Sequence, residues 1–148
     1  MMNFFKSFRY AFKGIIQSVK IGRNLRLQTV IAAYVLAAAP FFLDSRAEWA
    51  VLLLTVALLL CGEIFNTALE HLTDQAADGY SPLARSAKDA AAGAVLVCAV
   101  IAVVIGVVLF LRPDRIAAWF FYCQDHLWYP AVLILMLAPS WIFVFKTK

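Results

Sequence analysis

Four polar side chains in one long apolar stretch have the types and the spacing of a chemical site. Glu63, Asn66, Glu70 and Asp74 are separated by three, four and four residues, which places them on one face of an α-helix. On such a helix they span an arc of about 80°, and Glu63 lies about 16 Å further along the axis than Asp74. The pattern therefore predicts a polar stripe on an otherwise apolar helix.

Carboxylates in such surroundings need partners. A charge at the centre of a membrane span costs at least about 2.5–3.5 kcal/mol on insertion scales, so both glutamates must face protein, water or a cation. The stripe is consistent with a reactive site at a membrane surface. It is also consistent with a relay in a small proton- or cation-coupled transporter. A purely structural alternative is hydrogen bonding between packed helices.

A second charged pair enters at the same level of the membrane. After a turn at 78–82, the chain re-enters an apolar segment with Lys88 and Asp89, followed by alanine and glycine that allow close helix packing. His71 lies off the stripe and is expected to be a bystander. The sequence contains no glycine-rich phosphate loop and no other standard catalytic motif, so any phosphate must be held by side chains and a metal.

The composition excludes a soluble globular domain. Hydrophobic residues make up 64% of the chain and charged residues 15%, whereas soluble domains have about 45–50% and 25%. The net charge of +4 is explained by basic residues that flank membrane spans on the cytoplasmic side, so we expect no nucleic-acid partner. The chain is therefore predicted to be a membrane protein.

The elements that position the stripe follow from apolar runs of bilayer length. They predict spans at about 27–43, 48–73 and 86–111, with a further span at 127–145. In residues 3–22, basic side chains fall on one face of a helix and apolar side chains on the opposite face. This pattern predicts a helix that lies on the membrane surface. We thus expect an all-α membrane protein with an N-terminal amphipathic surface helix, three core transmembrane helices and a fourth C-terminal transmembrane helix.

The distribution of basic residues predicts the orientation. Alternate segments between the spans hold ten against three Lys and Arg residues, which places both termini and the 74–88 loop in the cytoplasm. We expect a multi-pass membrane protein, with the stripe opening on the cytoplasmic side.

The sequence resembles the small prokaryotic diacylglycerol kinase and undecaprenol kinase family. The resemblance rests on Glu63-Ile-Phe-Asn-Thr-Ala-Leu-Glu70 through Asp74, on Ala87-Lys-Asp-Ala-Ala-Ala-Gly-Ala-Val95, and on Tyr10-Ala-Phe-Lys-Gly14 in the surface helix. Asn-Thr-Ala in place of Asn-Ser-Ala looks closer to the undecaprenol kinase branch. The similarity covers residues 4–111.

This resemblance implies a lipid kinase that transfers the ATP γ-phosphate to a lipid primary alcohol with Mg²⁺, acting as a homotrimer. Undecaprenol is the first acceptor it implies and diacylglycerol the second. By resemblance, Glu63 is the general base, Asn66 a polar positioning group and Glu70 the metal ligand. The implied nucleotide site comprises Tyr10, Gly79, Tyr80, Ser81, Lys88 and Asp89. The kinase domain would be 1–111, with 112–148 an added interfacial segment and span.

One departure from the family pattern concerns the metal. The family has an acidic residue before Arg-Asn at the end of the surface helix, whereas this chain has Gly22 before Arg23 and Asn24. The implied metal site is therefore one carboxylate short. Either Asp74, water or the nucleotide completes the coordination, or the protein is a weak or inactive relative of the kinases.

Overall fold

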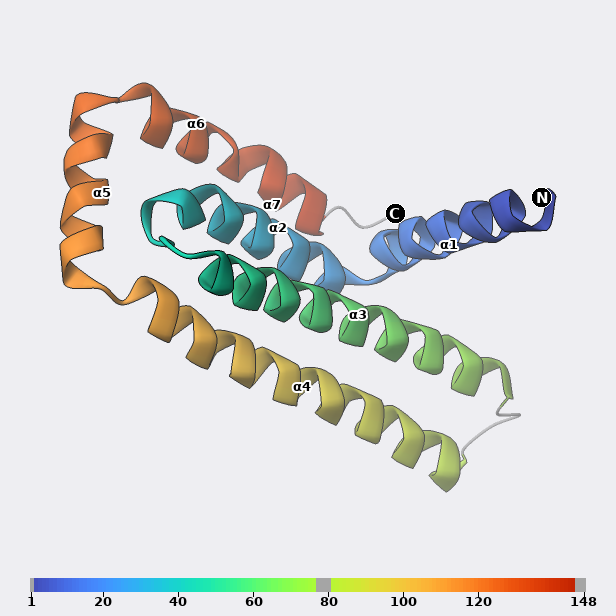
Figure 1. Cartoon of the computed structure of the whole chain (residues 1–148). Coiled ribbons are helices and arrows are strands. Elements are labelled where there is room, and N and C mark those ends of the chain that lie inside the picture. The colour runs from blue at the N-terminus through green and yellow to red at the C-terminus, as the bar shows by residue number, and fades with distance from the viewer. Residues whose placement is uncertain (1, 77–80, 146–148) are drawn as a thin grey trace.

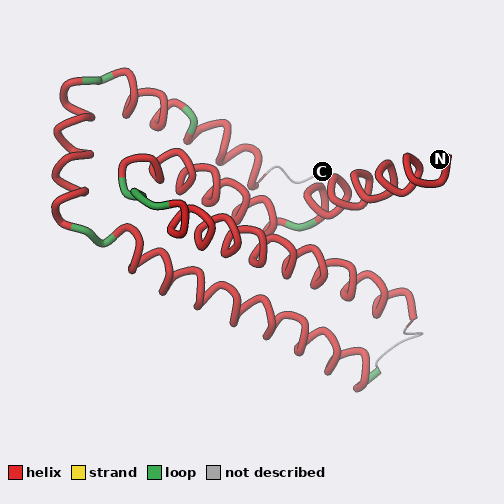
Figure 2. The backbone as a smooth tube through the Cα atoms, viewed as in Figure 1, coloured by secondary structure: helices red, strands yellow, loops and turns green. Residues whose placement is uncertain are grey.

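A computed structural model describes residues 2–76 and 81–145, and over these ranges the chain is helical with short connections (Figure 2). The elements are α1 (Met2–Ile21), α2 (Arg23–Ala38), a 3-10 turn η1 (Ala39–Phe41), α3 (Arg46–Ala76), α4 (Pro82–Phe110), α5 (Pro113–Asp125), α6 (Trp128–Leu135) and α7 (Leu137–Phe145). The predicted all-α membrane fold is confirmed.

Three helical segments of the described chain are long and apolar enough to cross a membrane. They are Arg46–Gln75, Pro82–Phe110 and Trp128–Phe145, the last formed by α6 and α7 together. The predicted 27–43 span falls on α2 and η1; α2 has only 16 residues and is about 24 Å long at 1.5 Å per residue. The predicted 3–22 surface helix coincides with α1.

The helices form a layered arrangement in which α2 is central (Figure 1). α3 and α4 lie side by side as an antiparallel pair, and α2 packs against α3. On the other side of α2 lies α7, which is reached through α5 at one end of the molecule. α1 ends one residue before α2 begins, and it also contacts α3.

The end of the molecule beside α5 is closed by packing and by ion pairs. Ala39, Phe42, Leu43, Leu52 and Leu109 form a buried cluster there. Next to it, Arg112 donates a hydrogen bond to the Phe42 carbonyl oxygen at 3.0 Å. It also pairs with Asp44 in the η1–α3 connection and with Glu48 in the first turn of α3. These contacts fix the ends of α3 and α4 that lie furthest from the stripe.

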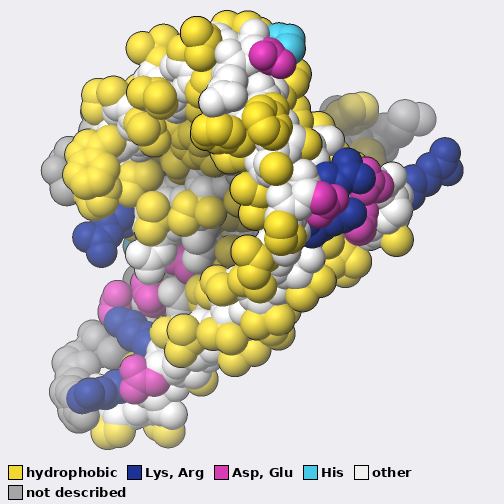
Figure 3. All heavy atoms as spheres, turned by 90° about the vertical axis from the view of Figure 1, so that its left-hand side faces the viewer, with side chains coloured by type: hydrophobic (Ala, Val, Ile, Leu, Met, Phe, Trp, Pro, Cys, Tyr) yellow, Lys and Arg dark blue, Asp and Glu magenta, His cyan; other side chains and the backbone are white. Residues whose placement is uncertain are grey.

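Most large apolar side chains of α3 and α4 are exposed, as expected for helices that face lipid. Figure 3 shows one face of this surface, where apolar side chains predominate and charged ones gather in small clusters.

Candidate active site

The stripe on α3 changes from buried to exposed along its length. Glu63 is only 3% exposed and Asn66 8%, whereas Glu70 and Asp74 are exposed. α3 can carry them in line because it runs unbroken for 31 residues without proline. The two deepest polar groups are thus covered by protein, which removes the cost of presenting them to lipid.

Hydrogen bonds hold the buried part of the stripe in place. The Gln28 amide on α2 donates from Nε2 to Glu63 Oε2 at 3.3 Å. Asn66 Nδ2 donates to Glu70 Oε1 at 2.8 Å, and the Thr67 hydroxyl donates to the Glu63 backbone oxygen at 2.9 Å. The site is therefore shared between α2 and α3.

Two amide oxygens in this site are buried and have no hydrogen-bond partner among the residues that the structure describes. They are Gln28 Oε1, beside the Glu63 carboxylate, and Asn66 Oδ1, beside the Glu70 carboxylate. Buried acceptors of this kind are normally satisfied by a donor, water or ion. Each carboxylate thus has beside it an acceptor that a hydroxyl group or a cation would satisfy.

The structure brings Lys88 of α4 to the exposed end of the stripe, where its ammonium pairs with the Asp74 carboxylate. Asp89 is also exposed and lies 3.9 Å from the Arg85 guanidinium in an i,i+4 pair on α4. A cation and two carboxylates, those of Glu70 and Asp74, therefore lie at the same end of the α3–α4 pair.

The other residues of the predicted nucleotide site are less closely assembled. Tyr10 is 68% exposed on α1. The Ser81 hydroxyl caps α4 by accepting the Ala84 N–H at 3.3 Å. Gly79 and Tyr80 lie outside the described residues. Their predicted role at the nucleotide stays a prediction.

Between α1 and α3 lies a cavity of about 250 Å³ with a partly polar wall. His71, which the sequence marked as a bystander, lines this cavity together with Gln17 and Ser18 of α1. Thr67 lines it as well, directly beside the stripe. α1 is therefore in contact with α3, the helix that carries the carboxylates.

The metal-binding capacity of the site matches only part of the implied ligand set. No group of three His, Cys, Asp or Glu side chains close enough to hold a metal occurs among the described residues. Asn66 and Glu70 are nevertheless joined by the hydrogen bond from Asn66 Nδ2 to Glu70 Oε1 at 2.8 Å, and each side chain carries oxygen that can bind a cation. Mg²⁺ is commonly held by one or two carboxylates together with substrate phosphates and water, so these residues fit Mg²⁺ bound with a nucleotide.

Gly22 lies close to this site between α1 and α2. A Cβ atom added there would lie 3.0 Å from the Ser18 carbonyl oxygen and 3.5 Å from Thr67 Oγ1. A side chain at position 22 would thus emerge beside the stripe, one helical turn from Glu70. The position at which the family pattern has an acidic residue therefore lies next to Thr67 of α3.

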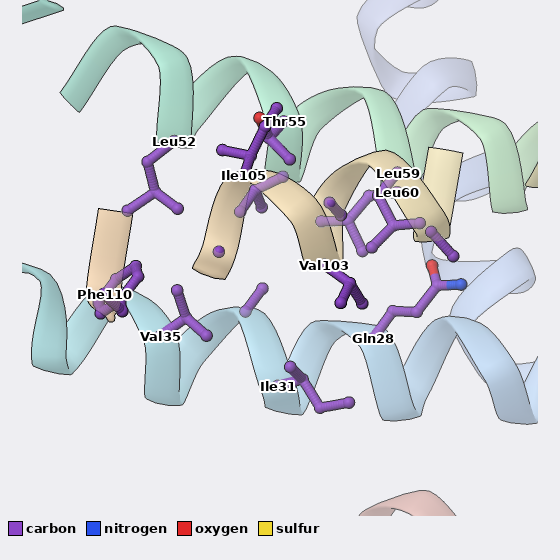
Figure 4. Close-up of a pocket in the computed structure, with 15 residues that line it drawn as sticks. Gln28, Ile31, Val35, Leu52, Thr55, Leu59, Leu60, Val103, Ile105 and Phe110 are labelled. Atoms are coloured by element: carbon purple, nitrogen blue, oxygen red, sulfur yellow. The ribbon is translucent and has the colours of Figure 1, made fainter. Parts of the chain in front are cut away.

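An apolar cavity of about 380 Å³ leads away from the buried end of the stripe between α2, α3 and α4 (Figure 4). Its walls are aliphatic side chains and Phe110, with Gln28 and Thr55 as the polar exceptions. In Figure 4, Gln28 lies toward one end and Phe110 toward the other. Because Gln28 also holds Glu63, the cavity ends next to the buried carboxylate.

Sequence reasoning did not identify Gln28. Like Glu63, Gln28 is a polar residue in an apolar run, and this is the signal that could have found it. The signal is weaker because an uncharged amide costs less to bury than a carboxylate. Its partner could not be read from the sequence, because helical periodicity does not tell which face of α3 meets α2.

Comparison with known proteins agrees with the motifs on α1, α3 and α4. A family model described as prokaryotic diacylglycerol kinase matches residues 9–110. The chain is 42% identical over 108 residues to the undecaprenol kinase of Bacillus subtilis (strain 168), which covers 73% of this chain and 88% of that protein. It is 41% identical over 112 residues to a diacylglycerol kinase of Synechocystis sp., covering 75% of this chain and 64% of that relative.

The matched region contains every residue of the stripe and ends where α4 ends. The family resemblance inferred from the sequence motifs is therefore confirmed. The chain belongs to the prokaryotic diacylglycerol kinase family.

Proposed function

We propose that this protein is a lipid kinase that transfers the γ-phosphate of ATP to the primary hydroxyl of a long-chain membrane alcohol. Undecaprenol is the first acceptor we propose and diacylglycerol the second. The observation that carries the proposal is the carboxylate of Glu63, which is buried, held by Gln28 and placed at the end of an apolar cavity. Family membership supports the same activity.

The apolar cavity accommodates the chain of the acceptor. Its aliphatic walls match a polyprenyl or acyl chain, and its polar end places a terminal hydroxyl beside Glu63 and Gln28. The similarity to the undecaprenol kinase of Bacillus subtilis extends over most of that relative's length and favours a polyprenol.

Glu63 then acts as the general base. Its carboxylate takes the hydroxyl proton as the alcohol oxygen attacks the γ-phosphorus, and the bond to the β–γ bridging oxygen breaks to release ADP. Gln28 orients the carboxylate by donating to Oε2, so that the single proton of the incoming hydroxyl is directed to Glu63. The phosphate acceptor is thereby aligned within the bilayer.

The exposed end of the stripe binds the nucleotide. Glu70, with Asn66 beside it, would hold Mg²⁺, which neutralises charge on the phosphates when bound. Lys88 supplies a further positive charge by exchanging Asp74 for a phosphate oxygen, and Asp89, Tyr10 and the 79–81 turn complete the nucleotide site. Phosphoryl transfer needs mainly positioning and charge neutralisation.

The membrane setting is part of the proposal. Basic residues concentrate on the segments that flank this end of the spans, so we place the site on the cytoplasmic side of a bacterial inner membrane. We assign residues 1–111 to the kinase domain and 112–148 to an added segment. The active form is proposed to be a homotrimer.

The decisive experiment measures ADP release from Mg-ATP by the purified protein in lipid bilayers, with undecaprenol, with diacylglycerol and without an acceptor. We expect acceptor-dependent turnover that is faster with undecaprenol, and loss of turnover in Glu63→Gln. Glu48→Gln is the matched control, because Glu48 lies on the same helix but accepts hydrogen bonds from Asp44 and Ser45 N–H groups at its far end. Ion flux without nucleotide and without phosphorylated lipid would instead support a transporter.

A further inference from the structure

The segment beyond the family region contacts the start of α2, close to the proposed base. Arg26, in the first turn of α2, is only 9% exposed. Its Nε donates to the carbonyl oxygen of Val144 in the last turn of α7 at 3.1 Å. Its Nη1 donates to the carbonyl oxygens of Val19 and Lys20 in the last turn of α1, at 3.1 and 2.8 Å. One guanidinium thus joins three helices.

The chemistry of this junction is specific for arginine. The last carbonyls of a helix have no partner within the helix and carry the negative end of its dipole. Arg26 satisfies such carbonyls at the ends of both α1 and α7, and within the described chain it forms no ion pair with a carboxylate. A rigid fork of N–H donors can reach three carbonyls at once, which a single ammonium group on a flexible stem does less well.

The segment formed by α6 and α7 contacts α2 near both of its ends. The Tyr34 hydroxyl of α2 donates to the Leu133 carbonyl oxygen of α6 at 3.2 Å. The Tyr129 hydroxyl of α6 donates to the Ala37 carbonyl oxygen at the other end of α2, at 3.1 Å. The matched family region ends at residue 110, so these contacts all come from the added segment.

The same end of α2 positions the proposed base. Gln28, two residues after Arg26, donates to Glu63. Leu25 and Thr29 flank these two residues and hold the first turns of α2: Leu25 is 2% exposed, and its carbonyl oxygen accepts the Thr29 hydroxyl at 2.7 Å. A displacement of this turn moves the Gln28 amide relative to the Glu63 carboxylate. A displacement of about 1 Å at a reacting group can cost about 100-fold in rate.

We propose that the C-terminal segment 112–145 is a positioning element for the kinase site, acting through the contact of Val144 with Arg26. α7 fixes the junction of α1 and α2, and this junction sets the place of Gln28 against Glu63. Arg26 is in this sense a positioning residue, since it reaches Glu63 only through α2. The inference rests on the proposed kinase function for its kinetic readout and on geometry for its second readout.

The kinetic experiment uses the full-length chain in bilayers. Arg26→Lys keeps the charge but not the fork of donors, and insertion of two alanines after Met136 turns α7 by about 200° and moves the Val144 carbonyl. Each change is expected to lower kcat about tenfold, with the KM for Mg-ATP within about twofold of the wild-type value. Both changes break the contact between Arg26 and the Val144 carbonyl oxygen. The combined variant is therefore expected to show no larger a loss of kcat than the more affected single variant.

Arg23→Gln is the matched control, because Arg23 is an exposed cation three residues earlier on the same helix. It should retain the wild-type kcat. Multiplicative losses in the combined variant, or an equal loss in Arg23→Gln, overturn the proposal. A loss that appears only as a lower yield of folded protein, with normal kcat per folded molecule, overturns it as well.

A second readout does not depend on activity. Nitroxide labels attached at Ile16→Cys on α1 and Leu72→Cys on α3, both exposed positions, report the distance between these helices in a background without native cysteines. We expect one narrow distance distribution in the wild type and in Arg23→Gln, and a broader one in Arg26→Lys and in the insertion variant. An unchanged distribution contradicts positioning. A wild type that shows this distribution but no kinase activity contradicts only the proposed function.

Discussion

The Gln28 amide on α2 donates a hydrogen bond to the Glu63 carboxylate on α3, with 3.3 Å between Nε2 and Oε2. The two residues are 35 positions apart in the sequence. Their contact lies at the end of the apolar cavity that Gln28 lines. The pair therefore joins the cavity proposed for the lipid chain to the carboxylate proposed as the proton acceptor.

Gln28→Leu should lower kcat by about tenfold and destabilise the protein by about 1–3 kcal/mol, because a buried carboxylate loses its donor. Thr55→Val is the control: Thr55 lines the same cavity, but its hydroxyl donates only within α3, to the Val51 carbonyl oxygen at 2.7 Å. Turnover with undecaprenol and thermal unfolding in detergent measure the two effects. Equal turnover in the two variants would show that Gln28 does not orient the base.

The nucleotide end of the site makes a separate prediction. Lys88→Gln removes the charge that pairs with Asp74 and should raise the KM for Mg-ATP by about tenfold, equivalent to about 1.4 kcal/mol. The KM for the lipid should stay within about twofold, because Lys88 lies at the exposed end of the stripe and away from the apolar cavity. Steady-state kinetics with each substrate varied in turn separate the two constants.

Arg23→Gln is its control, since it removes the same charge from an exposed side chain at the start of α2 that is not part of the proposed nucleotide site. If both variants raise the KM equally, general attraction of the nucleotide by positive charge explains the result and Lys88 has no specific role.

The sequence predicts the α3 stripe well because charges in an apolar helix are conspicuous and helical spacing alone places them on one face. It does not predict what covers that face. Arg26 lies at the very edge of the 27–43 run and counts only as a flanking charge, yet it is buried and bonded to α1 and α7. Contacts between helices distant in sequence depend on side-chain packing, which periodicity does not encode. Gly79 and Tyr80 lie outside the described residues, so the roles predicted for them stay predictions.

The apolar cavity predicts a dependence on acceptor length. Ala102 of α4 lines it, so Ala102→Phe should occupy the space of the lipid chain. We expect the KM for undecaprenol to rise by about tenfold, or about 1.4 kcal/mol, with a smaller rise for a short-chain alcohol. Val104→Phe adds the same ring to an outward position of the same helix, where Val104 is exposed, and should leave both constants unchanged. A rise that is equal for long and short acceptors would place the lipid chain elsewhere.

The position of Gly22 allows a test of the metal site. Gly22→Glu places a carboxylate beside Thr67, one turn from Glu70, and should lower the Mg²⁺ concentration for half-maximal turnover about tenfold relative to Gly22→Gln, equivalent to about 1.4 kcal/mol. The comparison is with glutamine because both side chains crowd the Ser18 carbonyl oxygen, which lies 3.0 Å from an added Cβ and also accepts the Gly22 N–H at 2.7 Å. That crowding should cost both variants about 1–3 kcal/mol of stability. Identical Mg²⁺ dependence in the two variants would mean that the absent carboxylate does not limit this protein and that the nucleotide or Asp74 completes the coordination.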